Sequence, residues 1–146
     1  MILDSGSRTE FESGAVRDVQ TGKGRPSLMP LDVVSNLLDD NILFYIEKFR
    51  ATRDTEYLHR VLRMFADDAF GDVHTMLLET SIHYEEGAAK YGDDNWRKGL
   101  PVCCYLDSAV RHYLKYRRGD RDEPHGRAFV WNIMCLMWEV DFHAEP

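Results

Sequence analysis

One segment near the carboxyl end of the chain constrains the fold more than any other. From Ala128 to Trp138, ten of eleven residues are apolar, and Asn132 is the exception. A helix that is apolar on every side needs cover on every side, so it lies at the centre of a helical bundle. Pro124 suits the first turn of this helix, which we expect to run to about Val140. The segment therefore predicts an all-α fold.

Apolar spacing predicts further helices around this central one. Over about 31–50 an apolar residue recurs every four positions, which is the spacing of an amphipathic helix. The remaining helices are expected over about 54–65, 72–92 and 101–119. No stretch shows the alternation typical of a strand. We therefore predict a bundle of about five helices, forming a single domain over residues 31–146, after an irregular, Gly-rich arm over residues 1–30.

The charge balance limits the class of partner. The chain has 146 residues, which fits one domain, and 18 basic against 25 acidic residues give a net charge of −7. Binding to a nucleic-acid polymer needs clustered Lys and Arg, so we expect no such partner. A small phosphorylated ligand is compatible with this charge, because carboxylates hold divalent metal ions that in turn bind phosphate.

The chain carries no pattern typical of a membrane or secreted protein. No apolar run reaches the roughly 18 residues needed to span a bilayer, and no signal peptide is visible. Cys103, Cys104 and Cys135 form neither a zinc pattern nor an even disulfide set. We therefore expect reduced thiols, a cytoplasmic location and no membrane partner.

Acidic side chains on two segments are candidates for a metal site. Asp120, Asp122 and Glu123 lie next to His125, and such an oxygen-rich group suits Mg²⁺ or Mn²⁺ better than Zn²⁺. The alternative is a solvated loop that caps a helix. Glu85 lies on an apolar arc of its helix, where a carboxylate must be paired, protonated or metal-bound unless that arc faces solvent.

Two other helices carry polar groups beside apolar faces. Asp107 and Arg111, spaced i and i+4, form either a structural ion pair or part of a metal or phosphate site. His112 points to the other side of an ideal helix and is the weaker candidate. Asn132 needs hydrogen-bond partners inside its apolar helix, so it either fixes the helix register or faces a ligand.

The loop after the third predicted helix combines aromatic and polar side chains. Tyr91 and Trp96 offer flat faces for a base, Lys90 offers positive charge, and Asn95 offers paired donor and acceptor groups. The alternative is that Trp96 simply fills the edge of the core.

Several stretches of the sequence occur in an order that resembles a known family. They are SGAVRD at 13–18 with GKGR at 22–25, HYEEGAAKYGDDNWRKGLP at 83–101, YLDSAVRHYLKY at 105–116 and GDRDEPHGRAFVWN at 119–132. Together they resemble the phage-associated dATP/dGTP diphosphohydrolases, relatives of the MazG-type all-α nucleoside triphosphate pyrophosphohydrolases. The resemblance covers residues 13–30 and 79–140, and residues 31–72 look like an inserted helical pair.

This resemblance implies a metal-dependent enzyme that cleaves the purine nucleotides dATP and dGTP to monophosphate and pyrophosphate. It also implies a homodimer or homotetramer, and the cytoplasm of an infected host if the chain is phage-encoded. The residues that we then expect at Mg²⁺ or Mn²⁺ are Glu85, Glu86, Asp107, Asp122, Glu123 and His125, with Glu85, Asp107 and Glu123 as catalytic groups. Those expected at the substrate are Lys90, Tyr91, Asn95, Trp96, Arg111, His112 and Asn132.

One departure from the MazG pattern leaves alternatives open. The MazG signature pairs Glu-x-x-Glu with a later Glu-x-x-Asp, whereas here the third helix has Glu79, Glu85 and Glu86 and the fifth has His125 and Asn132. A nucleotide-binding protein that sequesters a signalling nucleotide without hydrolysis is therefore one rival. A helical interaction module, in which the polar stripes are structural, is another.

The enzyme hypothesis makes a spatial prediction. Acids of the third and fourth helices are expected to converge with the acidic cluster at 122–125 around the metal ion. Arg17, Lys23 and Arg25 of the arm are expected to close over the phosphates.

Overall fold

The computed structural model describes residues 5–143 and confirms the all-α class. Its helices are α1 (Leu31–Leu38), α2 (Asn41–Thr52), α3 (Glu56–Phe65), α4 (Val73–Tyr91), α5 (Val102–Arg118) and α6 (His125–Trp138). Shorter 3-10 and π-helical turns are η1 (Pro26–Leu28), η2 (Ala66–Phe70), η3 (Asn95–Lys98) and η4 (Glu139–His143). Residues 1–4 of the predicted arm and 144–146 of the predicted domain lie outside the described residues. No helix in the described part is long and apolar enough to cross a membrane.

The arm contains a small antiparallel hairpin, which corrects the prediction that the chain has no strands. β1 (Arg8–Glu10) pairs with β2 (Val16–Asp18). Gly14 closes the turn between them with φ of 87°, a left-handed value that favours glycine. Each strand has only three residues, too few to show an alternation of apolar and polar side chains.

The single helix predicted over 31–50 is divided into α1 and α2, which is a second correction. Asp39 adopts a left-handed conformation with φ of 53°, and the Asp40 carboxylate accepts a hydrogen bond from the Leu43 N–H at 3.1 Å. Asp40 also accepts a hydrogen bond from the Tyr113 hydroxyl at 2.5 Å, which ties the break to α5. The four-residue apolar spacing continues across this break, so the spacing alone does not indicate that a second helix begins at Asn41.

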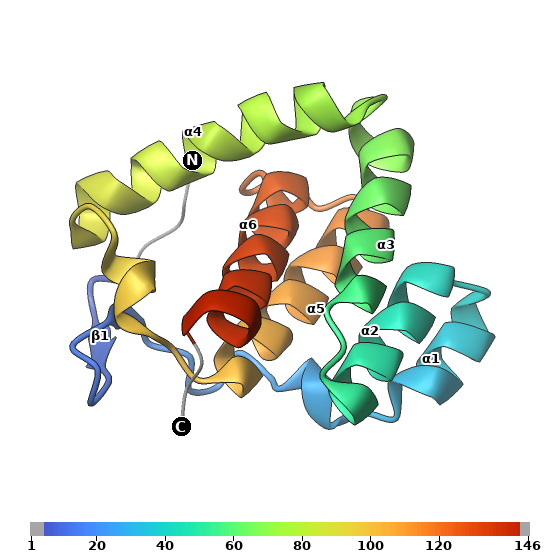
Figure 1. Ribbon diagram of the computed structural model, residues 1–146, viewed down its shortest axis with the longest axis horizontal. Helices are drawn as coiled ribbons and strands as arrows, with labels where there is room; N and C mark the ends of the chain where they lie inside the picture. The colour runs from blue at the N-terminus through green and yellow to red at the C-terminus, as the bar shows by residue number, and fades with distance from the viewer. Residues whose placement is uncertain (1–4, 144–146) are drawn as a thin grey trace.

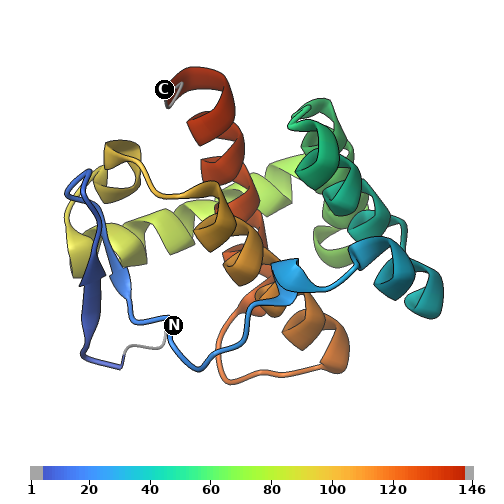
Figure 2. The same ribbon diagram turned by 90° about the horizontal axis from the view of Figure 1, so that it is seen from below.

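Helix α6 lies at the centre of the molecule, as its all-round apolar sequence predicts. It packs along α5, and α4 crosses over one end of this pair (Figure 1). Phe65 of α3 places its ring 4.8 Å from that of Phe129 in α6, so residues 31–72 share one continuous core with the rest of the bundle. The hairpin and η3 lie at the C-terminal end of α4, on the opposite side of the molecule from α1 and α2 (Figure 2).

Candidate functional site

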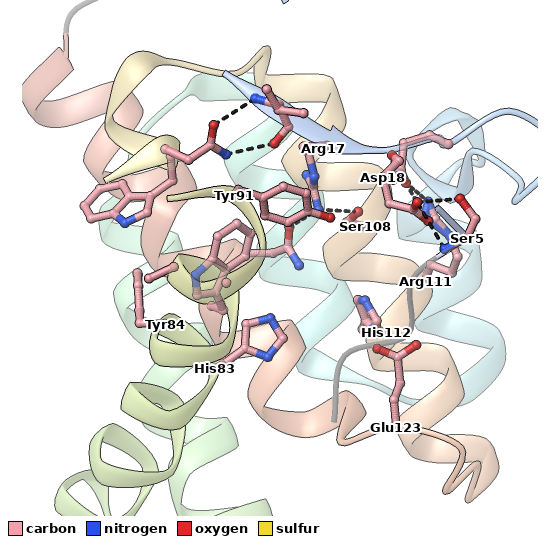
Figure 3. A pocket seen from close by; sticks show the side chains of 18 of the residues that line it. Ser5, Arg17, Asp18, His83, Tyr84, Tyr91, Ser108, Arg111, His112 and Glu123 are labelled. Atoms are coloured by element: carbon pink, nitrogen blue, oxygen red, sulfur yellow. Dashed lines mark hydrogen bonds between the residues drawn. The ribbon is translucent and has the colours of Figure 1, made fainter. Parts of the chain in front are cut away.

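A cavity of about 540 Å³ lies between the hairpin, the C-terminal half of α4, η3, α5 and α6 (Figure 3). Its volume falls within the range of roughly 300–1,000 Å³ that is usual for small-molecule sites. Its walls come from segments far apart in the sequence: α6 supplies Trp131 and Asn132, and the arm supplies Val16, Arg17, Asp18, Gln20 and Lys23. The fold therefore brings the N-terminal arm and α6 to one ligand-sized space.

Asn95 holds the hairpin in place as one wall of this cavity. The Asn95 side chain, which is 8% exposed, accepts a hydrogen bond from the Val16 N–H at 2.9 Å and donates one to the Val16 carbonyl at 2.8 Å. The Ser13 hydroxyl donates a further hydrogen bond to the Gly99 carbonyl. The amide that was expected to recognise a base thus anchors the arm in this structure.

Arg17 extends from β2 into the interior of the cavity (Figure 3). Its Nη2 donates hydrogen bonds to the Ser108 hydroxyl at 3.0 Å and to the Asn132 side-chain oxygen at 3.3 Å. Its guanidinium lies 5.7 Å from the centre of the Trp131 ring. Nη1 is buried and has no hydrogen-bond partner among the described residues. A buried donor without an acceptor is costly, so this side of the cavity is suited to an oxyanion.

Arg111 adds a second guanidinium to the same cavity. Both of its Nη atoms donate to the Gln20 side-chain oxygen, at 3.3 and 3.1 Å, while its buried Nε has no partner within residues 5–143. Burial, followed by the positive charge of Arg17, lowers the pKa of Arg111. Lys23 and Lys115 line the cavity as well. Lys23 is paired with Asp18 at 2.9 Å, so Arg17, Arg111 and Lys115 are the cavity cations that favour a negatively charged ligand.

Helix α4 forms the opposite wall, which is mainly aromatic. Tyr84 and Tyr91 line the cavity from α4, and Trp131 lines it from α6. Trp96 completes this wall, with its ring edge-on to that of Tyr84 at 5.7 Å. The Arg97 guanidinium lies over the Trp96 ring, 4.4 Å from the ring centre. Trp96 therefore both lines the cavity and fills the edge of the core, which combines the two interpretations of the sequence.

A cluster of imidazoles and carboxylates lies at the end of the cavity where α5 meets the start of α6. The Nδ1 atoms of His112 and His125 are 2.9 Å apart, and His125 Nε2 is 2.7 Å from the Asp122 carboxylate. Burial, together with neighbouring His125, strongly lowers the pKa of His112, whereas burial raises the pKa of Glu123. His112 and Glu123 both line the cavity, so this cluster is open to a ligand there.

Among the described residues, the side chains that could together hold a metal ion lie in this cluster. The ligand atoms of His112, Glu123 and His125 lie within 4.8 Å of one another, and those of Asp120, Asp122 and His125 do the same. Asp122, Glu123 and His125 are thus gathered as the sequence suggested. His112, the weaker candidate on an ideal helix, joins them because the start of α6 brings His125 to its side of α5.

Glu85, Glu86 and Asp107 lie elsewhere, so the expected convergence of acids from α4 and α5 does not occur within residues 5–143. Glu85 is exposed, because the arc of α4 that carries it faces solvent. Glu86 forms an ion pair with Arg127 of α6, at 2.7 Å. Neither carboxylate lines the cavity or belongs to the metal-ligand cluster.

Asp107 is paired with the arm instead of with Arg111. Its carboxylate accepts hydrogen bonds from Arg25 Nε at 2.7 Å and from the Ser27 N–H at 3.0 Å. Burial alone would raise the pKa of Asp107, but these hydrogen bonds together have the larger effect, and its pKa is lower than the ordinary value. Arg25 is therefore engaged away from the cavity, while Arg17 and Lys23 of the arm do line it, and Lys90 does not.

His83 and Ser108 are among the cavity residues that were not predicted from the sequence. His83 of α4 is 7% exposed, and burial lowers its pKa to about 4. Ser108 of α5 is 3% exposed and accepts the Arg17 hydrogen bond described above. The available signal for His83 was its spacing of four and eight residues from Gly87 and Tyr91, which places all three on one face of a helix.

The fold and the site define an all-α protein with a cavity that is cationic on one side and aromatic on the other. The comparison with protein families identifies the group to which it belongs. The family described as dATP/dGTP diphosphohydrolase, N-terminal, matches residues 64–145. This match spans more than half of the chain, and the chain belongs to this family. No curated protein and no solved structure gives a significant match.

The matched region contains α4, α5 and α6, and therefore the aromatic wall, Arg111 and the metal-ligand cluster. The hairpin with Arg17, and helices α1 and α2, lie outside it. The cavity is thus built jointly by the family domain and by the arm that precedes it.

Proposed function

We propose that this protein hydrolyses the purine deoxynucleoside triphosphates dATP and dGTP to monophosphate and pyrophosphate with the help of a divalent metal ion. The observation that carries the proposal is the pair Arg17 and Arg111, each of which has one buried nitrogen without a hydrogen-bond partner among the described residues: Arg17 Nη1 and Arg111 Nε. Both side chains line a cavity that His112 and Glu123 also line. The family match supports a diphosphohydrolase with a dATP or dGTP substrate.

The cationic wall suits a triphosphate for electrostatic reasons. A guanidinium that has left water needs a charged acceptor, and phosphate oxygens accept the parallel hydrogen bonds that guanidinium groups donate. Arg17 and Arg111 repel each other in the free protein, so an anion bound between them relieves this repulsion as well. In the reaction, the same two side chains would neutralise the charge that develops on the departing pyrophosphate.

The metal-ligand cluster fits a divalent ion, and its composition favours Mn²⁺ over Mg²⁺. His112, Glu123 and His125 supply two imidazoles and one carboxylate, whereas Mg²⁺ is bound mainly by oxygen. Asp122 would orient His125 through the hydrogen bond to its Nε2. When bound, such an ion supplies positive charge to the phosphates and lowers the pKa of a coordinated water.

The hairpin would exclude bulk water from the reacting phosphates. Arg17 and Asp18 line the cavity from β2, and Asn95 fixes their position through Val16.

Assembly into a homodimer or homotetramer is also part of the proposal. It stays a prediction from the family resemblance.

A nucleotide-binding protein without hydrolysis is the second candidate. The exposure of Glu85 and the engagement of Asp107 by Arg25 favour it, because they leave fewer carboxylates for metal binding than the sequence suggested. The same cavity would then retain a nucleotide unchanged.

Product analysis with each of the four deoxynucleoside triphosphates and Mn²⁺ separates these two candidates. Hydrolysis predicts pyrophosphate from dATP and dGTP, its loss on chelation, and its loss in Arg17→Met and Arg111→Met. Arg63→Met, which changes an exposed arginine of α3, is the matched control and should keep full activity. Nucleotide that binds but is recovered intact would support the second candidate and reject hydrolysis.

A further inference from the structure

The face of α4 that lines the cavity has a distinctive arrangement of side chains. Tyr84, Gly87, Ala88 and Tyr91 all line it, and their spacing of three, four and seven residues places them on one side of the helix. Two aromatic side chains thus flank a stretch where the helix has almost no side chain. This stretch forms a shallow slot in the cavity wall.

Gly87 is not required by the fold of the chain itself. It lies in the middle of α4, where glycine is less favourable than alanine for helix stability. Its backbone is not left-handed, and a Cβ atom added there would meet no atom of residues 5–143 within 4 Å. Neither backbone strain nor packing therefore explains the glycine. What it provides is open space on the cavity side of the helix.

His83 lies one turn before Gly87 and also lines the cavity (Figure 3). Only 7% of His83 is exposed, and its Nδ1 has no hydrogen-bond partner among residues 5–143. Its ring packs against Trp131, with the ring centres 5.5 Å apart. A buried imidazole nitrogen without a partner is costly unless a ligand supplies one.

We propose that the slot between Tyr84 and Tyr91 holds the purine base, that Gly87 keeps the slot open, and that His83 makes a hydrogen bond to the edge of the base. The proposal rests on the proposed function only for the identity of the ligand as a nucleoside triphosphate. Gly87 and His83 are specificity-determining residues in this proposal.

The opposing walls give the ligand its orientation. Arg111 and Lys115 lie on the α5 side and the slot lies on the α4 side, so a nucleotide that spans the cavity has its phosphates on one wall and its base on the other. The slot extends over seven residues of helix, or about 10 Å, which accommodates a bicyclic base lying flat. Because burial lowers the pKa of His83, the imidazole is neutral at pH 7 and offers one donor and one acceptor nitrogen.

Filling the slot provides the test. Gly87→Leu places a side chain where the base would lie, and Ala89→Leu is the matched control, because it puts the same side chain at an exposed position of the same helix. The ligands are α,β-methylene-dGTP, which resists hydrolysis, and inorganic tripolyphosphate. Binding of each to the full chain is measured by titration calorimetry with Mn²⁺ present.

We expect Gly87→Leu to weaken binding of the nucleotide about tenfold or more, because the leucine side chain would occupy the space of the base. Binding of tripolyphosphate should stay within about twofold of wild type, because the phosphate wall is unchanged. Ala89→Leu should change neither. Wild-type nucleotide affinity in Gly87→Leu, equal loss of both ligands, or no nucleotide binding by the wild type would overturn the proposal.

Two smaller changes keep the test independent of folding defects. Gly87→Ala should raise the melting temperature, because alanine is the better helix former, and yet weaken nucleotide binding. His83→Leu should weaken nucleotide but not tripolyphosphate binding, with partial recovery in His83→Gln. Because these readouts are binding constants, a wild-type protein that binds the nucleotide without cleaving it would reject hydrolysis while leaving the base slot supported.

Discussion

Replacing Asn95 with alanine tests whether the arm is an integral wall of the cavity. The change removes both hydrogen bonds to Val16, at 2.9 and 2.8 Å, and leaves the peptide groups of Val16 without these partners. At about 1 kcal/mol for each hydrogen bond, closure of the hairpin loses roughly 2 kcal/mol. The hairpin then opens about thirtyfold more often, and Arg17 leaves Ser108 and Asn132 whenever it opens.

Limited trypsin digestion with mass spectrometry measures this opening, because the bond after Arg17 lies inside β2 and is protected while the hairpin is closed. We expect cleavage after Arg17 to accelerate about thirtyfold in Asn95→Ala, with a smaller effect on global denaturation. Asn36→Ala, at an exposed position of α1, is the control. Cleavage after Arg17 at the wild-type rate would show that Asn95 does not hold the arm.

Three further predictions concern stability and metal binding. Tyr113→Phe removes the hydrogen bond to Asp40 and should lower the free energy of unfolding in urea by about 1–3 kcal/mol, whereas Tyr116→Phe should have little effect. Burial lowers the pKa of His83 from 6.5 to about 4 in the folded protein. Between pH 6.5 and 4 the His83 imidazole is therefore protonated in the unfolded chain and neutral in the folded one. Stability should therefore fall from pH 6.5 to 4, and this slope should be shallower in His83→Gln; identical slopes would contradict the assignment. Glu123→Gln should reduce the rise in melting temperature that Mn²⁺ produces, and an unchanged rise would exclude Glu123 as a ligand.

Local sequence patterns predicted the elements that depend only on neighbouring residues. The apolar run around Asn132 identified the central helix, and α5 ends at Gly119, which has the left-handed φ of 88° typical of a helix end. The Asp–Glu–His cluster before α6 was also recognisable, because its members are nearly adjacent in the sequence.

Pairings over long distances could not be predicted in this way. Asn95 contacts Val16 across 79 residues, and Asp107 contacts Arg25 across 82. Helical periodicity shows which face a residue occupies but not which distant segment packs against that face. For this reason the sequence indicates Arg111, one turn along the same helix, as the partner of Asp107. In the structure the partner of Asp107 is Arg25 of the arm.

The most direct test of the proposed reaction is the position at which water enters the nucleotide. Hydrolysis of dGTP by the full chain in ¹⁸O-labelled water, followed by mass spectrometry of the products, distinguishes attack at the α-phosphorus from attack elsewhere. Attack at the α-phosphorus predicts that the label enters dGMP and that pyrophosphate leaves unlabelled. Label in pyrophosphate or in inorganic phosphate, or the release of intact triphosphate, would contradict the proposed reaction.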